Sequence, residues 1–301
     1  MRTTPIDLSQ LPAPDIVDEL DYETILAEKK ARLVALYPME QQDEIAATLE
    51  LESEPMVKQL QEAAYDKMLL LALINEKARG ILLAYAKGTT LEHIGALFDV
   101  DRLMISAGDP DKGIDPVYED DDNLRERIQL APRGFSVAGP TDAYVFHARA
   151  ADGRVKAATA YSPSPCVMIV TVLSREGDGT ANDELLGIVR KALEKKRPQA
   201  DEVIVQSAKI VRYAIQGTLR FFDGPDRAVA LAEAQKKTLQ FAESMHRPGS
   251  EITKDGLYAS MRVAGVQKVL LDTPAEGVAI AIDQAPYCTG VELKDGGVAD
   301  D

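Results

Sequence analysis

Residues 55–87 read PMVKQLQEAAYDKMLLLALINEKARGILLAYAK, and this stretch decides how the N-terminal part of the chain folds. Apolar residues recur at alternating intervals of three and four, the spacing that aligns side chains along one side of a helix. Eight of the nine positions in this seam are apolar; the seam comprises Val57, Leu60, Ala64, Lys67, Leu71, Ile74, Ala78, Ile81 and Tyr85. A second apolar face consists of Met68, Leu69, Leu70, Leu73, Leu82 and Leu83. The pattern predicts a single helix of roughly 50 Å.

A helix that is apolar on two sides needs packing partners on two sides. We expect Ser53 to cap its N-terminus, Pro55 to occupy its first turn and Gly88 to follow its end. Short helices expected at residues 21–36 and 43–52 can cover one side, and another subunit can cover the other. The residues expected in an inter-subunit bundle are Leu60, Ala64, Leu71, Ile74 and Ala78. A bundle formed entirely within one chain is the alternative.

The rest of the chain changes from helices to alternating strands and helices. A short helix at residues 89–98 precedes an acidic loop from Asp99 to Asp122, which reads as a linker or mobile surface loop, and a helix restarts near Asn123. Residues 166–173, CVMIVTVL, are apolar and β-branched, which predicts a buried strand. A helix from Asn182 or Asp183 to Leu193 and a strand at 203–205 complete a β-α-β unit. The further expected elements are strands at 209–222, 266–271, 278–282 and 291–293, and helices at 227–245 and, capped by Thr253, at 253–264.

These elements predict an α+β fold: an N-terminal all-helical arm or bundle followed by two small α/β sandwich-like modules with mixed sheets. The expected divisions are a helical domain at residues 1–105, the acidic loop and a connecting helix at 106–132, a middle α/β domain at 133–215 and a C-terminal α/β domain at 216–301.

The charge of the chain excludes several classes of function. The formal net charge is 34 − 49 = −15, and residues 1–60 alone hold 13 acidic against 5 basic side chains. Neither nucleic acid nor an anionic membrane suits so acidic a surface. The two cysteines and three histidines have no zinc-site spacing, and no disulfide framework is indicated, so a reducing compartment is the default. We find neither a signal peptide nor an apolar run long enough to span a bilayer, and expect a soluble protein made inside the cell.

Residues 90–100 (TLEHIGALFDV) have the spacing of the first helix and turn of a helix-turn-helix. The following residues offer an acidic loop where a recognition helix should present Arg, Lys, Gln or Asn to bases. A helical hairpin corner accounts for the segment better, although a DNA-binding regulator stays open as an alternative.

The remaining motifs give no assembled active site. The acidic loop fails the EF-hand register: with Asp109 as the first position, Gly113 is fifth, where a ligand belongs, and Ile114 is sixth, where glycine is needed. Weak divalent-ion binding stays open there. Gly177-Asp178-Gly179 is a tight turn between strand and helix rather than a phosphate loop. An enzyme of unidentified type would need Ser136, His147 and an acid to converge.

Several segments together resemble the baseplate J-like family, the wedge proteins of contractile-tailed bacteriophages and tail-derived bacteriocins, and most of all its members from temperate enterobacterial phages. The matching stretches follow family order over nearly the whole chain. They are LPAPDIVDELDYETIL (11–26), ATLELESEP (47–55), ILLAYAKGTTLEHIGAL (81–97), RERIQLAPRGFSVAGPTDAYVFHA (125–148), VTVLSREGDGT (170–180), YASMRVAGVQKVLLDTP (258–274) and QAPYCTGVEL (284–293).

This resemblance implies a structural role without catalytic, cofactor-binding or metal-binding residues. It implies that two copies associate with one smaller tail protein in a wedge, that six wedges close into a ring around the tail hub beneath the sheath initiator, and that the ring rearranges on contraction. It places the chain in the virion, at the tail baseplate, after assembly in the host cytoplasm. In the matching loop, the candidate interface residues are Gly134, Phe135, Gly139 and Pro140; retention of the two glycines and the proline for a turn is the alternative.

Overall fold

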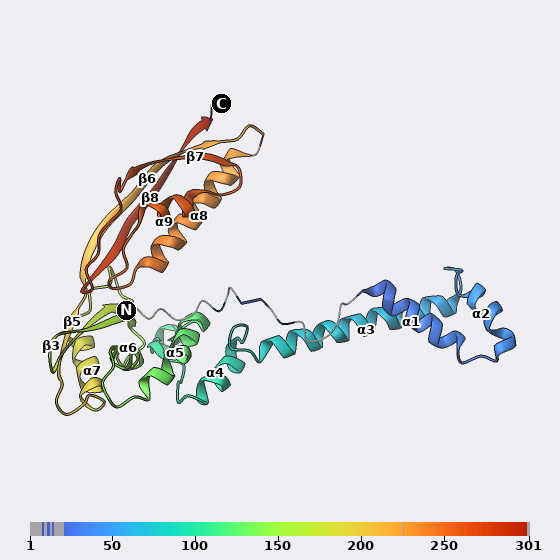
Figure 1. Cartoon of the computed structure of the whole chain (residues 1–301), viewed down its shortest axis with the longest axis horizontal. Helices are drawn as coiled ribbons and strands as arrows, with labels where there is room; N and C mark the ends of the chain where they lie inside the picture. Colours follow the sequence, from blue (N-terminus) through green and yellow to red (C-terminus); the bar gives the residue numbers. More distant parts are fainter. Residues whose placement is uncertain (1–7, 9–10, 13, 15–20, 225, 300–301) are drawn as a thin grey trace. The chain divides into compact units, whose positions relative to one another are not determined.

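The computed structural model describes residues 8, 11–12, 14, 21–224 and 226–299. Contacts divide the chain into two compact units, one of residues Ile6–Ile94 and one that contains Gly95–Asp301. The first unit is helical and the second holds two sheet modules (Figure 1). The expected α+β class is therefore confirmed. None of the helices in the described ranges is long and apolar enough to cross a membrane.

The helical unit, which we call the arm, is built on a pair of helices. Its elements are α1 (Tyr22–Val34), the 3-10 helix η2 (Met39–Gln41), α2 (Gln42–Thr48), α3 (Pro55–Gly80) and most of α4 (Gly88–Ala96). α1 packs on α3, with Ile25, Leu26 and Ala64 buried between them. Asp21 caps α1 by accepting a hydrogen bond from the Thr24 N–H at 2.9 Å. The arm therefore has a small aliphatic core of its own.

The long helix differs from the expectation at both ends. α3 stops at Gly80 instead of Lys87, so its 26 residues extend roughly 39 Å. Glycine is the least helix-favouring residue after proline, and beyond it the Leu82 N–H turns back to the Arg79 carbonyl at 3.0 Å. Gly88, expected to follow the helix, begins α4. At the N-terminus the capping position is Glu54 and not Ser53, while Pro55 occupies the first turn as predicted.

The acidic segment after α4 is folded, which corrects its interpretation as a linker or mobile loop. β1 (Met104–Ser106) pairs antiparallel with β2 (Val117–Tyr118), and the 3-10 helix η3 (Pro110–Lys112) lies between them. Its anchor is an ion pair between Glu119 and Arg127, whose side chains are 1% and 4% exposed. Arg127 also donates to the Asp101 carbonyl at 2.9 Å. A charged residue that composition alone assigns to solvent is thus part of the core.

The middle module is a three-stranded mixed sheet with helices packed on it. Its elements are α5 (Asp121–Gly134), α6 (Thr141–Ala150), β3 (Val155–Ser164), β4 (Val167–Ser174), α7 (Asp183–Glu194) and β5 (Glu202–Ser207). The strand order is β3-β4-β5, antiparallel and then parallel. The predicted β4-α7-β5 unit is confirmed, with Asn182 as the N-cap of α7. β3 was not among the expected elements.

The C-terminal module repeats this mixed arrangement with longer strands. Its elements are β6 (Lys209–Phe221), α8 (Arg227–Met245), α9 (Lys254–Met261), β7 (Val266–Thr273) and β8 (Gln284–Val298), in the sheet order β7-β6-β8. α8 and α9 pack on the sheet, and large side chains such as Ile215, Leu219 and Phe221 are fully buried beneath them. Only one residue, Ala208, separates β5 from β6.

Several expected boundaries in this module are wrong. The strand expected at 278–282 is reduced to a single bridge between Val278 and Ile252, because Gly277 has a φ of +87° and turns the chain. The strand expected at 291–293 is the middle of the much longer β8. The helix capped by Thr253 ends at Met261 and not at 264. Residue 215, after which a domain division was expected, lies inside β6.

Candidate interaction surfaces

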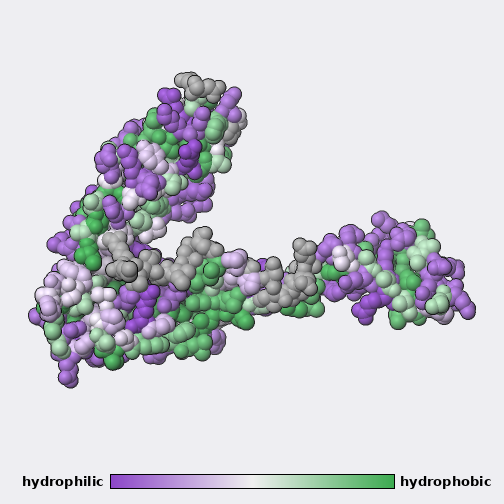
Figure 2. Space-filling view, in the orientation of Figure 1, coloured by the Kyte–Doolittle hydropathy of each residue, from purple (hydrophilic) through white to green (hydrophobic). Residues whose placement is uncertain are grey.

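α3 carries a row of large apolar side chains that its own unit leaves exposed. Leu70 is 57% exposed, and its neighbours on the helix are exposed to between 37% and 52%. These neighbours are Met56, Tyr65, Leu69, Leu73 and Ile74. Ile81 and Leu82 continue the row beyond the helix, and Figure 2 shows hydrophobic residues gathered over α4 and the adjoining end of α3. Large apolar side chains that gather on an exposed element mark interaction sites, so these residues are candidates for an interface.

The five seam residues predicted for an inter-subunit bundle divide between two environments. Ala64 is fully buried against α1 of the same chain, and Leu60 and Leu71 pack partly against the same cluster. Ile74 is 42% exposed and Ala78 is half-buried. α1 therefore occupies part of the surface that we expected a second subunit to cover. The face that remains open is centred on Leu69, Leu70 and Leu73, which the sequence analysis had placed on the second apolar face.

Four candidate interface residues lie at the loop between α5 and α6, and the requirements of folding account for three of them. A Cβ on Gly134 would lie 2.2 Å from the Phe146 ring, so only glycine fits there. Gly139 has a φ of +74°, and a Cβ on it would lie 2.7 Å from the Pro198 side chain. Pro140 is the N-cap residue of α6. The fourth residue, Phe135, is 63% exposed and is therefore the member of this group that is free for contact with a partner.

The structure does not bring the expected catalytic candidates together. Ser136 is exposed and its hydroxyl accepts a hydrogen bond from the Ala138 N–H at 3.3 Å. His147 lies in α6 with its ring against Phe146, at a centroid distance of 5.3 Å. Burial and the nearby Lys196 lower the pKa of His147. Neither side chain contacts the other, so the arrangement offers no nucleophile and base.

The other motifs are also explained by folding within the described residues. After α4 the chain forms β1, η3 and β2 where a recognition helix would have to lie. The Gly177–Gly179 turn is filled by its own neighbours, since a Cβ on Gly179 would lie 2.5 Å from Leu173 and 2.9 Å from His246. Nowhere in these ranges do three or more His, Cys, Asp or Glu side chains gather in a way that could hold a metal ion.

A set of charged side chains joins the middle module to the C-terminal module, and no local sequence pattern predicts it. Glu126 on α5 contacts Arg149 on α6 at 3.0 Å and Arg247, just after α8, at 2.7 Å. Burial alone would raise the pKa of Glu126, but the two arginine charges outweigh it and hold that pKa below its ordinary value. Asp178 and Arg212 form a further ion pair at 2.5 Å.

His246 is the buried member of this junction. Its Nδ1 lies 3.1 Å from the Lys156 ammonium, which also pairs with Glu243, and its Nε2 has no hydrogen-bond partner among the described residues. Burial and the positive charge of Lys156 lower the pKa of His246, against the opposing effect of Glu243 and Asp178. The apolar part of the junction is small and consists of Ala157, Leu173, Ala208 and Ala285, with Ile210 beside them. The two modules thus meet through a largely polar interface.

Exposed apolar side chains on α3 and on the α5–α6 loop are typical of a structural protein. Residues 52–109 match the Baseplate J-like N-terminal domain, and residues 136–207 match the Baseplate J-like central domain. The chain is 47% identical over 297 residues to baseplate protein J of Escherichia phage P2, covering 97% of this chain and 98% of that protein. The chain belongs to the baseplate J-like family. It is a structural component of a phage tail baseplate and not an enzyme.

A solved structure of the anti-feeding prophage (AFP) baseplate, obtained by cryo-EM with 6-fold symmetry, contains a chain of limited likeness. The two chains share 15% identity with a TM-score of 0.38, over 58% of this chain and 43% of the other.

Proposed function

We propose that the chain is a wedge subunit, in which the exposed face of α3 binds a second copy and a smaller wedge protein. Six such wedges would close into a ring around the tail hub, beneath the sheath initiator. The single observation that carries this proposal is the apolar row on α3, because the arm's own helices leave it uncovered. Burial of a leucine contributes about 1.5–3 kcal/mol, so several such residues make a stable helical interface.

The exposed loop residue Phe135 supports a second contact of the same kind. Phe135 and Val137 are 63% and 87% exposed, on a loop whose backbone is fixed at Gly134 and Gly139. A rigid loop with an aromatic tip loses little conformational entropy on binding, which favours its use as an anchor in a neighbouring subunit.

We propose further that the ring rearranges on sheath contraction by movement at the junction of the two sheet modules. The polar contacts of Glu126, Lys156 and Asp178 support this, since polar interfaces separate at a smaller cost in apolar exposure than hydrophobic ones.

The test of wedge formation is the mass of the native assembly. The full chain is purified alone and with the proposed smaller wedge protein, and both samples are measured by native mass spectrometry. We expect two copies of the chain in the joint sample and loss of that species in Leu73→Glu. The matched control is Gln59→Glu, which adds the same charge to an exposed polar position of α3. A monomer in both samples contradicts the proposal.

A further inference from the structure

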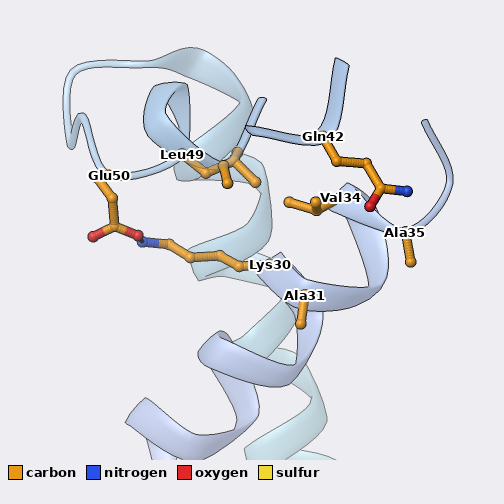
Figure 3. Close-up of a pocket in the computed structure, with 8 residues that line it drawn as sticks. Lys30, Ala31, Val34, Ala35, Gln42, Leu49 and Glu50 are labelled. Atoms are coloured by element: carbon orange, nitrogen blue, oxygen red, sulfur yellow. Dashed lines mark ion pairs between the residues drawn. The ribbon is translucent and has the colours of Figure 1, made fainter. Parts of the chain in front are cut away.

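Two hollows among the described residues differ in their chemistry. The groove between α1 and α2 in the arm has a volume of about 370 Å³, and its charged residues, Lys30 and Glu50, form an ion pair at 3.6 Å. Figure 3 shows Val34 directed toward Leu49 while Lys30 reaches across to Glu50, so the charges of this groove satisfy each other. The hollow of about 200 Å³ in the C-terminal module is instead lined by His246, whose buried Nε2 has no partner among the described residues.

The ring of His246 belongs to the C-terminal module, but both of its nitrogens lie against the middle module. Nδ1 lies 3.1 Å from the Nζ of Lys156 on β3. Nε2 lies against the turn between β4 and α7, where a Cβ on Gly179 would be only 2.9 Å from it. The residue is 7% exposed. Because the imidazole is inserted between two elements of the neighbouring module, a movement of one module against the other changes its contacts.

The contact with Lys156 requires a neutral imidazole. A lysine ammonium group donates hydrogen bonds and cannot accept them, so Nδ1 is the acceptor and the ring proton is on Nε2. A second proton would have to bind at Nδ1, which would replace the hydrogen bond by two like charges 3.1 Å apart. Since the ring is buried, little water or salt screens that repulsion. Protonation therefore converts a contact between the modules into a repulsion.

The other ionisable groups around the ring keep their charge in mildly acidic solution. The groups that face the ring are Lys156 from β3, Asp178 from the turn, Glu243 from α8, and Tyr287 and Cys288 from β8. Hydrogen bonds hold the pKa values of Asp178 and Glu243 below their ordinary 3.8 and 4.5, and burial raises the pKa of Cys288 above its ordinary 9.0. Burial and the Lys156 charge lower the pKa of His246 from 6.5. The imidazole is thus left to titrate between about pH 7 and about pH 5.

The hollow gives the ring access to solvent. Leu239 and Glu243, which line it together with His246, are exposed. A volume of about 200 Å³ also holds several waters, which can solvate a protonated imidazole once it leaves Lys156.

The remaining contacts between the modules limit how far they separate. Lys156 also pairs with Glu243, but that carboxylate is 73% exposed, and exposed ion pairs contribute little. Asp178 pairs with Arg212 on β6, and Glu126 pairs with Arg247 at 2.7 Å. These pairs persist when the imidazole is charged, so its protonation loosens the junction without detaching the modules.

We propose that His246 is a proton-sensitive latch between the middle and C-terminal modules. The neutral ring holds Lys156 and keeps the junction closed, whereas uptake of one proton repels Lys156 and lets the modules shift against each other. By linkage, opening of the junction in turn favours uptake of the proton. The inference deepens the movement proposed at this junction, and its role in the ring rests on that proposal, while the proton response is a property of the isolated chain.

The tautomer and the titration of the ring are measured on the full-length chain by NMR of the histidine ring nitrogens. His93→Gln, His147→Gln and His246→Gln assign the three rings. We expect neutral His246 to carry its proton on Nε2 and to titrate with a midpoint below 6.5. Lys156→Gln keeps a donor near Nδ1 but removes the charge, so the midpoint should rise toward 6.5. A proton on Nδ1, or a midpoint that Lys156→Gln leaves unchanged, overturns the proposal.

The opening is measured as a distance between the modules by Förster transfer. Dyes are attached to Cys166, which is exposed between β3 and β4, and to Lys236→Cys, at an exposed position of α8, in a chain that carries Cys288→Ser. We expect one distance population at about pH 8 and a second that includes about half of the molecules or more at about pH 5. Its midpoint should coincide with that of the His246 titration. A ring that titrates without a second population overturns the proposal.

Three variants of the labelled chain assign the response to its residues. His246→Gln can still accept from Lys156 but cannot be protonated, and Lys156→Gln removes the repulsion, so neither should form the second population. His147→Gln is the matched control, because it removes a histidine whose ring contacts Phe146 within the middle module. It should respond as the parent chain does. Opening that persists in His246→Gln, or that is lost in His147→Gln, assigns the proton to another group and contradicts the latch.

The same dye pair in assembled tails separates this inference from the movement proposed above. We expect the distance to change on contraction and the isolated chain to respond to pH. A proton response without a change on contraction supports the latch and refutes the proposed movement. A change on contraction without a proton response refutes the latch alone.

Discussion

The arm and the C-terminal module place their apolar side chains in opposite ways. In the C-terminal module, Ile215, Leu219 and Phe221 are buried completely under two helices. In the arm, α1 and α3 bury a small cluster that includes Ile25, Leu26 and Ala64, while Leu69, Leu70 and Leu73 of α3 are exposed. The apolar side chains of the C-terminal module therefore stabilise it within the chain, whereas many of those on α3 stay exposed, as the proposed association requires.

The largest expected effect tests directly whether the two regions differ in how their apolar side chains contribute to stability. Phe221→Ala should lower the free energy of unfolding by about 3–5 kcal/mol, because it leaves a cavity in a closed core. Leu73→Ala, at a side chain 47% exposed, should change the unfolding of the isolated chain by no more than about 0.5 kcal/mol and still weaken assembly. Urea denaturation of both variants, with native masses alongside, measures the two effects. Equal destabilisation would remove the distinction between the regions.

A comparable loss of stability is expected at the buried ion pair of the unit that holds the two sheet modules. Arg127→Met leaves Glu119 buried without its partner, which should cost about 3–5 kcal/mol. Glu119→Gln/Arg127→Met removes both charges and should recover a large part of that loss. Denaturation of the single and double variants forms the test; a double variant no more stable than the single one would show that packing, and not the charge, is responsible.

A smaller effect of opposite sign is expected in the arm. Gly80 ends α3, has open space where a Cβ would stand and does not need a positive φ. Gly80→Ala should therefore stabilise the last turn by about 1 kcal/mol and increase the helical signal in circular dichroism. Gly134→Ala is the contrasting variant, since its Cβ would meet the Phe146 ring, and it should destabilise the chain. No gain in helical signal for Gly80→Ala would mean that another interaction ends the helix.

The smallest effect concerns pH. The folded-state pKa of His246 lies below its ordinary value of 6.5, so the unfolded chain binds the proton more readily. The stability that neutral His246 contributes is complete above pH 6.5 and declines as pH falls below that value. His246→Gln should flatten the stability profile over this range, with exposed His93→Gln as the control. A profile that keeps its slope in His246→Gln assigns the proton to another group.

The sequence predicted those elements whose signal is local. The run CVMIVTVL, the cap at Asn182 and the amphipathic helix after it define β4 and α7 without help from the rest of the chain. β3 was not predicted because its sequence, VKAATAYSPS, is rich in alanine and serine. It is a strand because it pairs with β4, and not because of its β-propensity. β8 was shortened to 291–293 because glycines interrupt it; pairing with β6 holds the remainder.

The interaction surfaces were predicted less well for a related reason. Periodicity identified two apolar faces on α3 but could not say which of them α1 would cover. The contact of Glu126 with Arg247 joins residues 121 positions apart. The groove between α1 and α2 arises from small residues on these two helices. Both depend on tertiary packing, for which a single sequence carries no periodic signal.

The passage from β5 to β6 has a mechanical consequence. Ala208 is the single residue between the two strands, it is buried, and its N–H donates to the Val172 carbonyl at 2.9 Å. No loop that could extend under load separates β5 from β6, and β6 is the central strand of its own sheet. A pull on the C-terminal module would be passed along β6 into the middle sheet as tension instead of being absorbed by a loose tether. Movement of one module would then be coupled mechanically to movement of the other.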